Sequence, residues 1–112
     1  MSNEPPQGTD FVRATLSVLG GKWKILILWH LKDAPLRFNA LRRSIPEISE
    51  KVLIQQLREL EKDKVVSRTV FSRVPPHVEY AFSNYGRSLK PVLDVLCNWG
   101  EEHLKRNAQK ED

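Results

Sequence analysis

One row of polar side chains lies along the helix that the sequence predicts over residues 49–64. Its members follow one another at intervals of four, three and four residues, which keeps them on one side of a helix: Lys51, Gln55, Arg58 and Lys62. The guanidinium of Arg58 suits guanine O6 and N7, and the amide of Gln55 suits adenine N6 and N7. This chemistry is that of a surface that reads base edges in a major groove. A solvated polar face is the alternative for any single helix.

The opposite side of the same helix carries leucines. Leu53, Leu57 and Leu60 form one narrow stripe that we expect to face a core. Ser49 is a suitable N-cap residue, and Ile54 lies beside the polar row, where it could touch a thymine methyl group. The predicted base-reading set comprises Ser49, Lys51, Ile54, Gln55, Arg58 and Lys62.

A basic hairpin is predicted next to this helix. The residues over 66–71 are rich in β-branched types, and those over 78–82 alternate apolar and polar, so two strands are expected. Proline has no N–H to donate, so Pro75 and Pro76 should part the strands over a loop at 72–77. We call this hairpin with its loop the wing, and its basic residues are Arg68, Arg73 and His77. The loop could enter a minor groove, although Arg73 could equally be a solvated loop residue.

Further basic and polar residues could hold phosphates and set the register without reading sequence. The candidates are Lys22, Lys24, Asn39, Arg42 and Arg43, and some of them are expected to be plain surface charges. Over residues 22–73 there are 12 Lys and Arg against 6 Asp and Glu, whereas the whole chain has a net charge of +4. A basic block of this kind favours polyanions, but an ordinary solvated surface would explain it as well.

Four helices and the hairpin precede a final helix. The first helix is expected over 10–19, ending at Gly20-Gly21, and a nearly all-apolar, buried second helix over 22–32. A short third helix capped by Asn39 runs to Ile45, and the fourth follows a tight turn, as in a helix-turn-helix. Ser83 caps the last helix, and Pro91 bends it or shifts its start. The predicted domain covers 10–104, between flexible tails at 1–9 and 105–112.

The first and last helices carry apolar stripes that one small domain cannot easily cover. The stripe residues are Val12, Leu16, Leu19, Leu89, Val92, Leu93, Leu96 and Trp99. Burial across a two-fold axis would form a homodimer and place two reading helices one DNA turn apart, about 34 Å. The alternative is that part of a stripe packs on its own core.

Several segments in series resemble the HxlR-type regulators, which are bacterial winged helix-turn-helix proteins related to the MarR group. They are Gly20–Lys24, Arg37–Arg43, Gln55–Leu60 and Val74–Tyr80, and the resemblance covers about residues 10–103. It implies an α+β winged helix-turn-helix with N- and C-terminal dimerisation helices, acting as a homodimer on a palindromic operator. Many members have a cysteine where Asp10 stands here, so redox sensing by that route is not expected. The lone Cys97 is expected to pack as a small buried hydrophobe.

Other classes find little support in 112 residues with one cysteine and three separated histidines. No catalytic set, cofactor motif, metal-ligand spacing, signal peptide or membrane span is evident. We therefore predict a cytoplasmic, non-enzymatic, sequence-specific regulator that binds double-stranded DNA and blocks or recruits polymerase. Two alternatives stay open, namely a winged helix that binds proteins and a sensor of a small-molecule effector held between the dimer helices and the winged helix.

Overall fold

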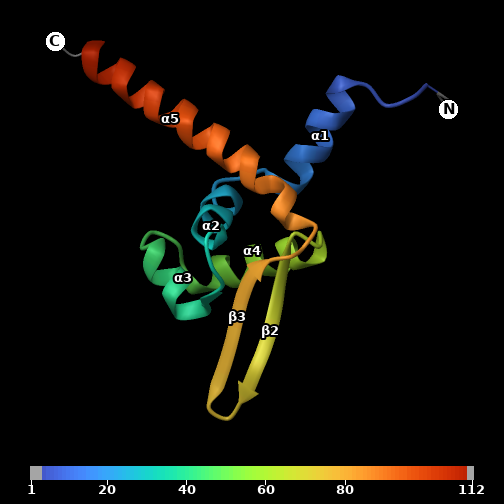
Figure 1. Ribbon diagram of the computed structural model, residues 1–112, viewed down its shortest axis with the longest axis vertical. Helices are drawn as coiled ribbons and strands as arrows, with labels where there is room; N and C mark the ends of the chain where they lie inside the picture. Colours follow the sequence, from blue (N-terminus) through green and yellow to red (C-terminus); the bar gives the residue numbers. More distant parts are fainter. Residues whose placement is uncertain (1–3, 111–112) are drawn as a thin grey trace.

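Two helical arms and a long hairpin project in opposite directions from a small helical body (Figure 1). The computed structural model describes residues 4–110. Its elements, in chain order, are α1 (Gly8–Leu19), α2 (Lys24–Leu31), β1 (Leu36–Arg37), α3 (Phe38–Ser44), α4 (Glu50–Lys62), β2 (Val66–Arg73), β3 (Pro76–Phe82), the 3₁₀ helix η1 (Gly86–Leu89) and α5 (Lys90–Lys110). The three strands form one antiparallel sheet in the order β1-β3-β2. The α+β class and the winged helix-turn-helix arrangement are confirmed.

The core lies where α2, α3 and α4 meet the base of the sheet. Each helix contributes an apolar side that is almost fully buried, and the largest buried side chains are Ile27, Leu28, Leu41, Ile45, Leu53, Leu57, Leu60, Leu93 and Val65. In the second helix, Ile27, Leu28 and Leu31 are buried, as its apolar circumference predicts, whereas Leu26 stays 37% exposed. The helix is shorter at both ends than the predicted range of 22–32.

Helix α4 begins and ends as its sequence predicts. The Ser49 hydroxyl accepts a hydrogen bond from the backbone N–H of Val52 at 3.2 Å, which satisfies one of the free donors of the first turn. Just beyond the helix, Lys64 has a positive φ of 65°, a left-handed conformation typical of the residue that ends a helix. The predicted cap at Ser49 is thus confirmed.

The hairpin of β2 and β3 extends further than predicted. Arg73 pairs with Pro76, so the loop expected over 72–77 shrinks to a two-residue tip at Val74 and cis Pro75. Pro76 is tolerated because it is the first residue of its strand, where a missing N–H costs little. The register shifts once between Val70 and Ser72, which leaves Phe71 as the extra residue of a bulge.

Ser83 joins the end of α4 to the start of the C-terminal arm. Its hydroxyl donates to the carbonyl oxygens of Lys64 at 2.6 Å and Val65 at 3.1 Å, and it accepts from the N–H of Gly86 at 2.8 Å. A Cβ at Gly86 would lie 2.0 Å from the Val65 oxygen, so only glycine permits this approach. The Ser83 hydroxyl therefore satisfies the first N–H of η1, whose N-cap residue is Tyr85. Helix α5 starts later, at Lys90, with Pro91 in its first turn as one of the two predicted possibilities.

Three predicted boundaries move. Helix α3 begins at Phe38 after Arg37, not after Asn39, because Phe38 packs against the core. Residues 8–9 of the predicted N-terminal tail already belong to α1, and residues 1–3 lie outside the described residues. Residues 105–110 of the predicted C-terminal tail continue α5, supported by pairs such as Lys105 with Glu101 at 3.7 Å, and 111–112 lie outside the described residues.

Candidate nucleic-acid interface

The polar row on α4 is exposed, and the leucine stripe behind it is buried. Lys51, Gln55, Arg58 and Lys62 are all exposed. On the inner side, Leu53, Leu57 and Leu60 are no more than 1% exposed. Ile54, which lies between the two sides, is half-buried. The helix therefore presents its donors outward, as the predicted reading surface requires.

A groove of about 1040 Å³ lies between α3, α4 and the sheet. Four arginines and two glutamates line it: Arg37, Arg43, Arg58, Arg68, Glu50 and Glu61. The arginines come from four different elements, so the fold gathers charges that are spread over the sequence. A concave, mainly cationic surface that gathers four guanidinium groups suits a phosphate backbone.

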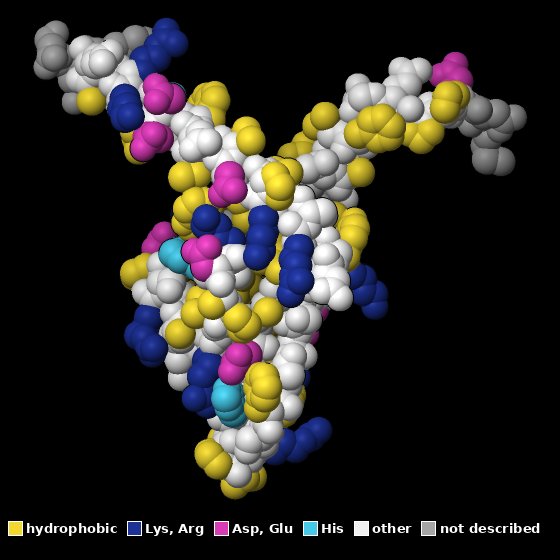
Figure 2. Space-filling view, in the orientation of Figure 1, with side chains coloured by type: hydrophobic (Ala, Val, Ile, Leu, Met, Phe, Trp, Pro, Cys, Tyr) yellow, Lys and Arg dark blue, Asp and Glu magenta, His cyan; other side chains and the backbone are white. Residues whose placement is uncertain are grey.

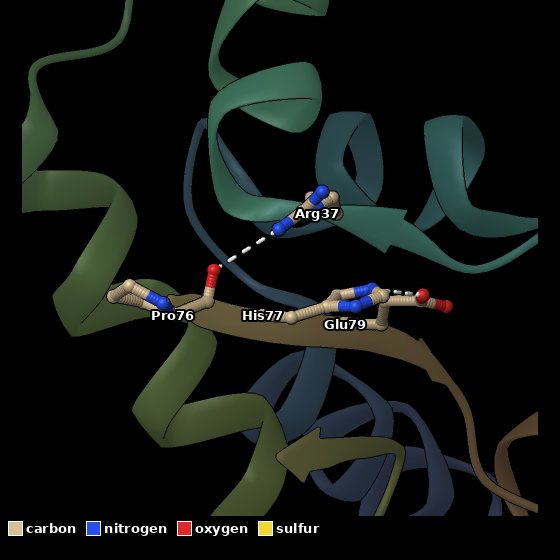
Figure 3. Close-up of polar contacts among 4 residues, drawn as sticks. All are labelled: Arg37, Pro76, His77 and Glu79. Carbon is tan, nitrogen blue, oxygen red and sulfur yellow. Dashed lines mark hydrogen bonds and ion pairs between the residues drawn. The ribbon is translucent and has the colours of Figure 1, made fainter. Parts of the chain in front are cut away.

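The wing carries its basic residues in two different states. Arg68 and Arg73 are exposed, and at the tip Val74 is 91% exposed. His77 instead contacts Glu79, with His77 Nε2 lying 2.6 Å from Glu79 Oε2 (Figure 3). Phe71 packs against the His77 ring at a centroid distance of 4.9 Å. His77 lies in β3, not in the loop where it was predicted, and is engaged with Glu79 within the wing.

The candidate phosphate-binding residues divide in a similar way. Asn39 and Arg43 are exposed on α3, and Arg42 forms an ion pair with Glu50 at 3.6 Å. Lys22 is exposed, and its ammonium lies 4.7 Å from the centre of the Trp23 ring.

Lys24 is only 8% exposed, and its ammonium pairs with Glu59 of α4 at 3.8 Å. The predicted phosphate contact of Lys24 is wrong, because Lys24 points inward and ties α2 to α4.

The apolar stripes of the two arms, α1 and α5, are only partly exposed to solvent (Figure 2). Leu19 is 5% exposed and Leu93 is 1% exposed, because both pack in the subunit's own core, and Leu89 packs half-buried against it. Leu19, Leu89 and Leu93 were predicted to lie in the dimer interface, and the structure instead packs them against the subunit's own core. The exposed members are Val12, Leu16, Val92, Leu96 and Trp99, joined by three residues that the sequence analysis missed: Phe11, Val95 and Leu104.

Cys97 is exposed on α5. The expectation that it is a small buried hydrophobe is therefore wrong for the single subunit, because among the described residues of α5 it is Leu93 that packs in the core. Within residues 4–110, no cluster of three or more His, Cys, Asp or Glu side chains is arranged to hold a metal ion. No helix in that range is long and apolar enough to cross a membrane.

Three charged residues of the groove, Arg37, Glu50 and Glu61, were not predicted from the sequence. Glu50 and Glu61 lie on the groove side of α4, and helical spacing alone could have placed them beside Ile54 and Arg58. Arg37 had no such signal, because its role depends on a contact with the wing that is remote in sequence.

Comparisons with known proteins agree with this architecture. A family model described as HxlR-like helix-turn-helix matches residues 18–108. The uncharacterized HTH-type transcriptional regulator YtcD of Bacillus subtilis is 55% identical over 95 residues, which cover 85% of this chain and 75% of YtcD.

Solved structures give the same result. The crystal structure of YtcD superposes with a TM-score of 0.80 at 53% identity, over 84% of this chain and 96% of that one. The structure of the redox regulator HypR in its oxidized form superposes with a TM-score of 0.78 at 46% identity, over 81% of this chain and 94% of HypR. A MarR-family regulator from Enterococcus faecalis V583 superposes with a TM-score of 0.79 at 35% identity, over 96% of this chain and 99% of that protein. The chain therefore belongs to the HxlR-like helix-turn-helix family and is a transcriptional regulator of the helix-turn-helix type.

Proposed function

We propose that this protein binds double-stranded DNA in a sequence-specific manner, with α4 in the major groove. The observation that carries the proposal is the division of α4 into an exposed polar row and a buried leucine stripe. Arg58 and Gln55 are the two members able to make bidentate contacts with a purine. Lys51, Lys62 and the hydroxyl of Ser49 add donors along the same side, and Ile54 supplies an apolar contact.

The remaining cationic groups hold the backbone on either side of α4. Arg43 and Asn39 project from α3, and Arg68 lies on β2 beside the groove. Arg73, at the end of the hairpin, reaches an adjacent minor groove. Contacts of this kind fix the register, while α4 supplies sequence discrimination.

The proposed assembly is a homodimer joined through its arms. Five residues of the predicted set stay exposed on α1 and α5 in the single subunit, including Leu16 at 60% and Trp99 at 67%. Apolar side chains of this size, spread along two projecting helices, lose contact with water when a second copy covers them. A two-fold dimer would then present two copies of α4 to the half-sites of a palindromic operator.

Selection of bound duplexes from a random DNA pool tests the proposal directly. We expect a palindromic consensus with two half-sites one helical turn apart, bound at least about 1000-fold more tightly than shuffled DNA at physiological salt. Fluorescence anisotropy on the selected and shuffled duplexes measures this ratio. Weak binding that ignores sequence and disappears with salt would contradict the proposal and would favour a winged helix that binds proteins.

A further inference from the structure

The edge strand beside the wing stops early. β1 contains only Leu36 and Arg37, which pair with Tyr80 and Glu79 of β3. The chain then turns into α3 at Phe38, so the strand does not continue toward the wing tip. The part of β3 nearest the tip therefore lacks a neighbour on this side within the described sheet.

The side chain of Arg37 extends into that space. Its Nη2 atom donates a hydrogen bond to the carbonyl oxygen of Pro76 at 3.0 Å, across 39 residues of sequence (Figure 3). Pro76 is the first residue of β3 and pairs with Arg73 on the other strand. The guanidinium thus binds a carbonyl oxygen at the edge of β3 beyond the end of β1. It connects the start of α3 to the outer end of the wing.

The same end of the wing is held internally. Next to Pro76, His77 binds Glu79 through Nε2 and contacts the ring of Phe71, which lies on the opposite strand. The hairpin end is therefore stiffened by its own side chains. The hydrogen bond from Arg37 adds a restraint from outside the hairpin at the same end, so its loss should let this end both shift and open locally.

We propose that Arg37 is a positioning residue that fixes the wing relative to α3 and α4. This inference rests on the proposed DNA binding. With the wing held, the guanidinium of Arg73 lies at a constant offset from α4, and both elements reach the duplex at once. Without the hydrogen bond, the hairpin end swings and the Arg73 contact must be formed from many orientations, at an entropic cost.

Arg37 also lines the groove and is exposed, so a direct phosphate contact is the competing role. The two roles differ in how they depend on Arg73. A positioning residue that acts through Arg73 loses its effect when Arg73 is absent. A residue that binds its own phosphate keeps its effect in either background.

A double-mutant cycle on the selected operator separates the roles. We expect Arg37→Ala to weaken binding by roughly 5- to 150-fold, the range of one net hydrogen bond lost in each of the two subunits. Arg73→Ala should weaken it as well, and the double variant should bind about as well as Arg73→Ala alone. Arg43→Ala is the matched control. It removes a groove arginine that does not contact the wing in the described hydrogen bonds, so its loss should multiply with that of Arg73→Ala.

Hydrogen exchange without DNA supplies an independent measurement. The amides of Ser72, Arg73 and His77 should exchange faster in Arg37→Ala than in the parent protein, and those of α4 should not change. Losses that multiply in the Arg37 and Arg73 cycle would overturn the inference, as would unchanged affinity or unchanged exchange in the single variant. If the parent protein shows no sequence-specific binding, the proposed function fails, and the exchange experiment still decides whether Arg37 holds the wing.

Discussion

Replacing Arg58 with alanine tests the reading surface on α4. The side chain is exposed and faces away from the leucine stripe, so its loss should change the free energy of unfolding by no more than about 0.5 kcal/mol. A bidentate contact with one base pair contributes about 1–3 kcal/mol of discrimination. A two-fold dimer makes the contact twice, so we expect a loss of about 2–6 kcal/mol, or roughly 30-fold at the lower end.

Fluorescence anisotropy on the selected operator measures the affinity, and a set of single-base-pair variants measures the preference at each position. Arg58→Ala should relax the preference at one base pair in each half-site. Arg87→Ala is the matched control, because it removes the same exposed cation from η1, at the opposite end of the hairpin from the wing tip. The assignment of α4 is refuted if a folded Arg58→Ala protein keeps both the operator affinity and the base preference of the parent.

Three further predictions concern the elements that support this surface. Trp99→Asp combined with Leu96→Asp should convert the proposed dimer into a single chain of 13.0 kDa, because two charges would enter the apolar interface. Sedimentation at micromolar concentration measures this mass. A dimer that persists would show that α5 does not form the dimer contact. Lys24→Met should lower the free energy of unfolding, measured by urea denaturation, by up to about 1 kcal/mol through loss of the pair with Glu59. A selective loss of DNA affinity in the folded variant would show that Lys24 does bind phosphate. Ser49→Ala should lower the free energy of unfolding by about 0.5–2 kcal/mol in the same urea assay. Ser49→Asn should recover most of this loss, since asparagine also caps helices. Equal stability of all three proteins would contradict the capping role.

Local patterns predicted α4 well. Its cap, its leucine stripe and its polar row all depend on residues within one helix, where spacing alone determines which side chains share a face. The same reasoning failed for the wing tip. The two prolines predict strands that part over residues 72–77. A proline at the first position of a strand instead allows pairing to continue, as it does between Arg73 and Pro76.

Contacts between distant segments could not be predicted in the same way. Lys24 resembles a surface charge in the sequence, and only the fold brings Glu59 of α4 within 3.8 Å of it. On the arms, periodicity identified apolar stripes without showing what covers them. The structure divides these stripes, because Leu19 and Leu93 pack in the subunit while Leu16 and Trp99 remain exposed. Arg37 was missed for the same reason, since its partner Pro76 lies on the wing.

The junction at Ser83 couples the geometry of the arms to that of α4. One hydroxyl binds the backbone at both Val65 and Gly86, and the close approach at Gly86 leaves no room for the two segments to slide. The C-terminal arm α5 and helix α4 therefore turn together. For an arm of 21 residues, about 30 Å long, a tilt of about 6° displaces one end by about 3 Å, close to the rise of one base pair. In the proposed dimer, the angle at which the arms of the two subunits cross would therefore set the half-site spacing that the two copies of α4 can span.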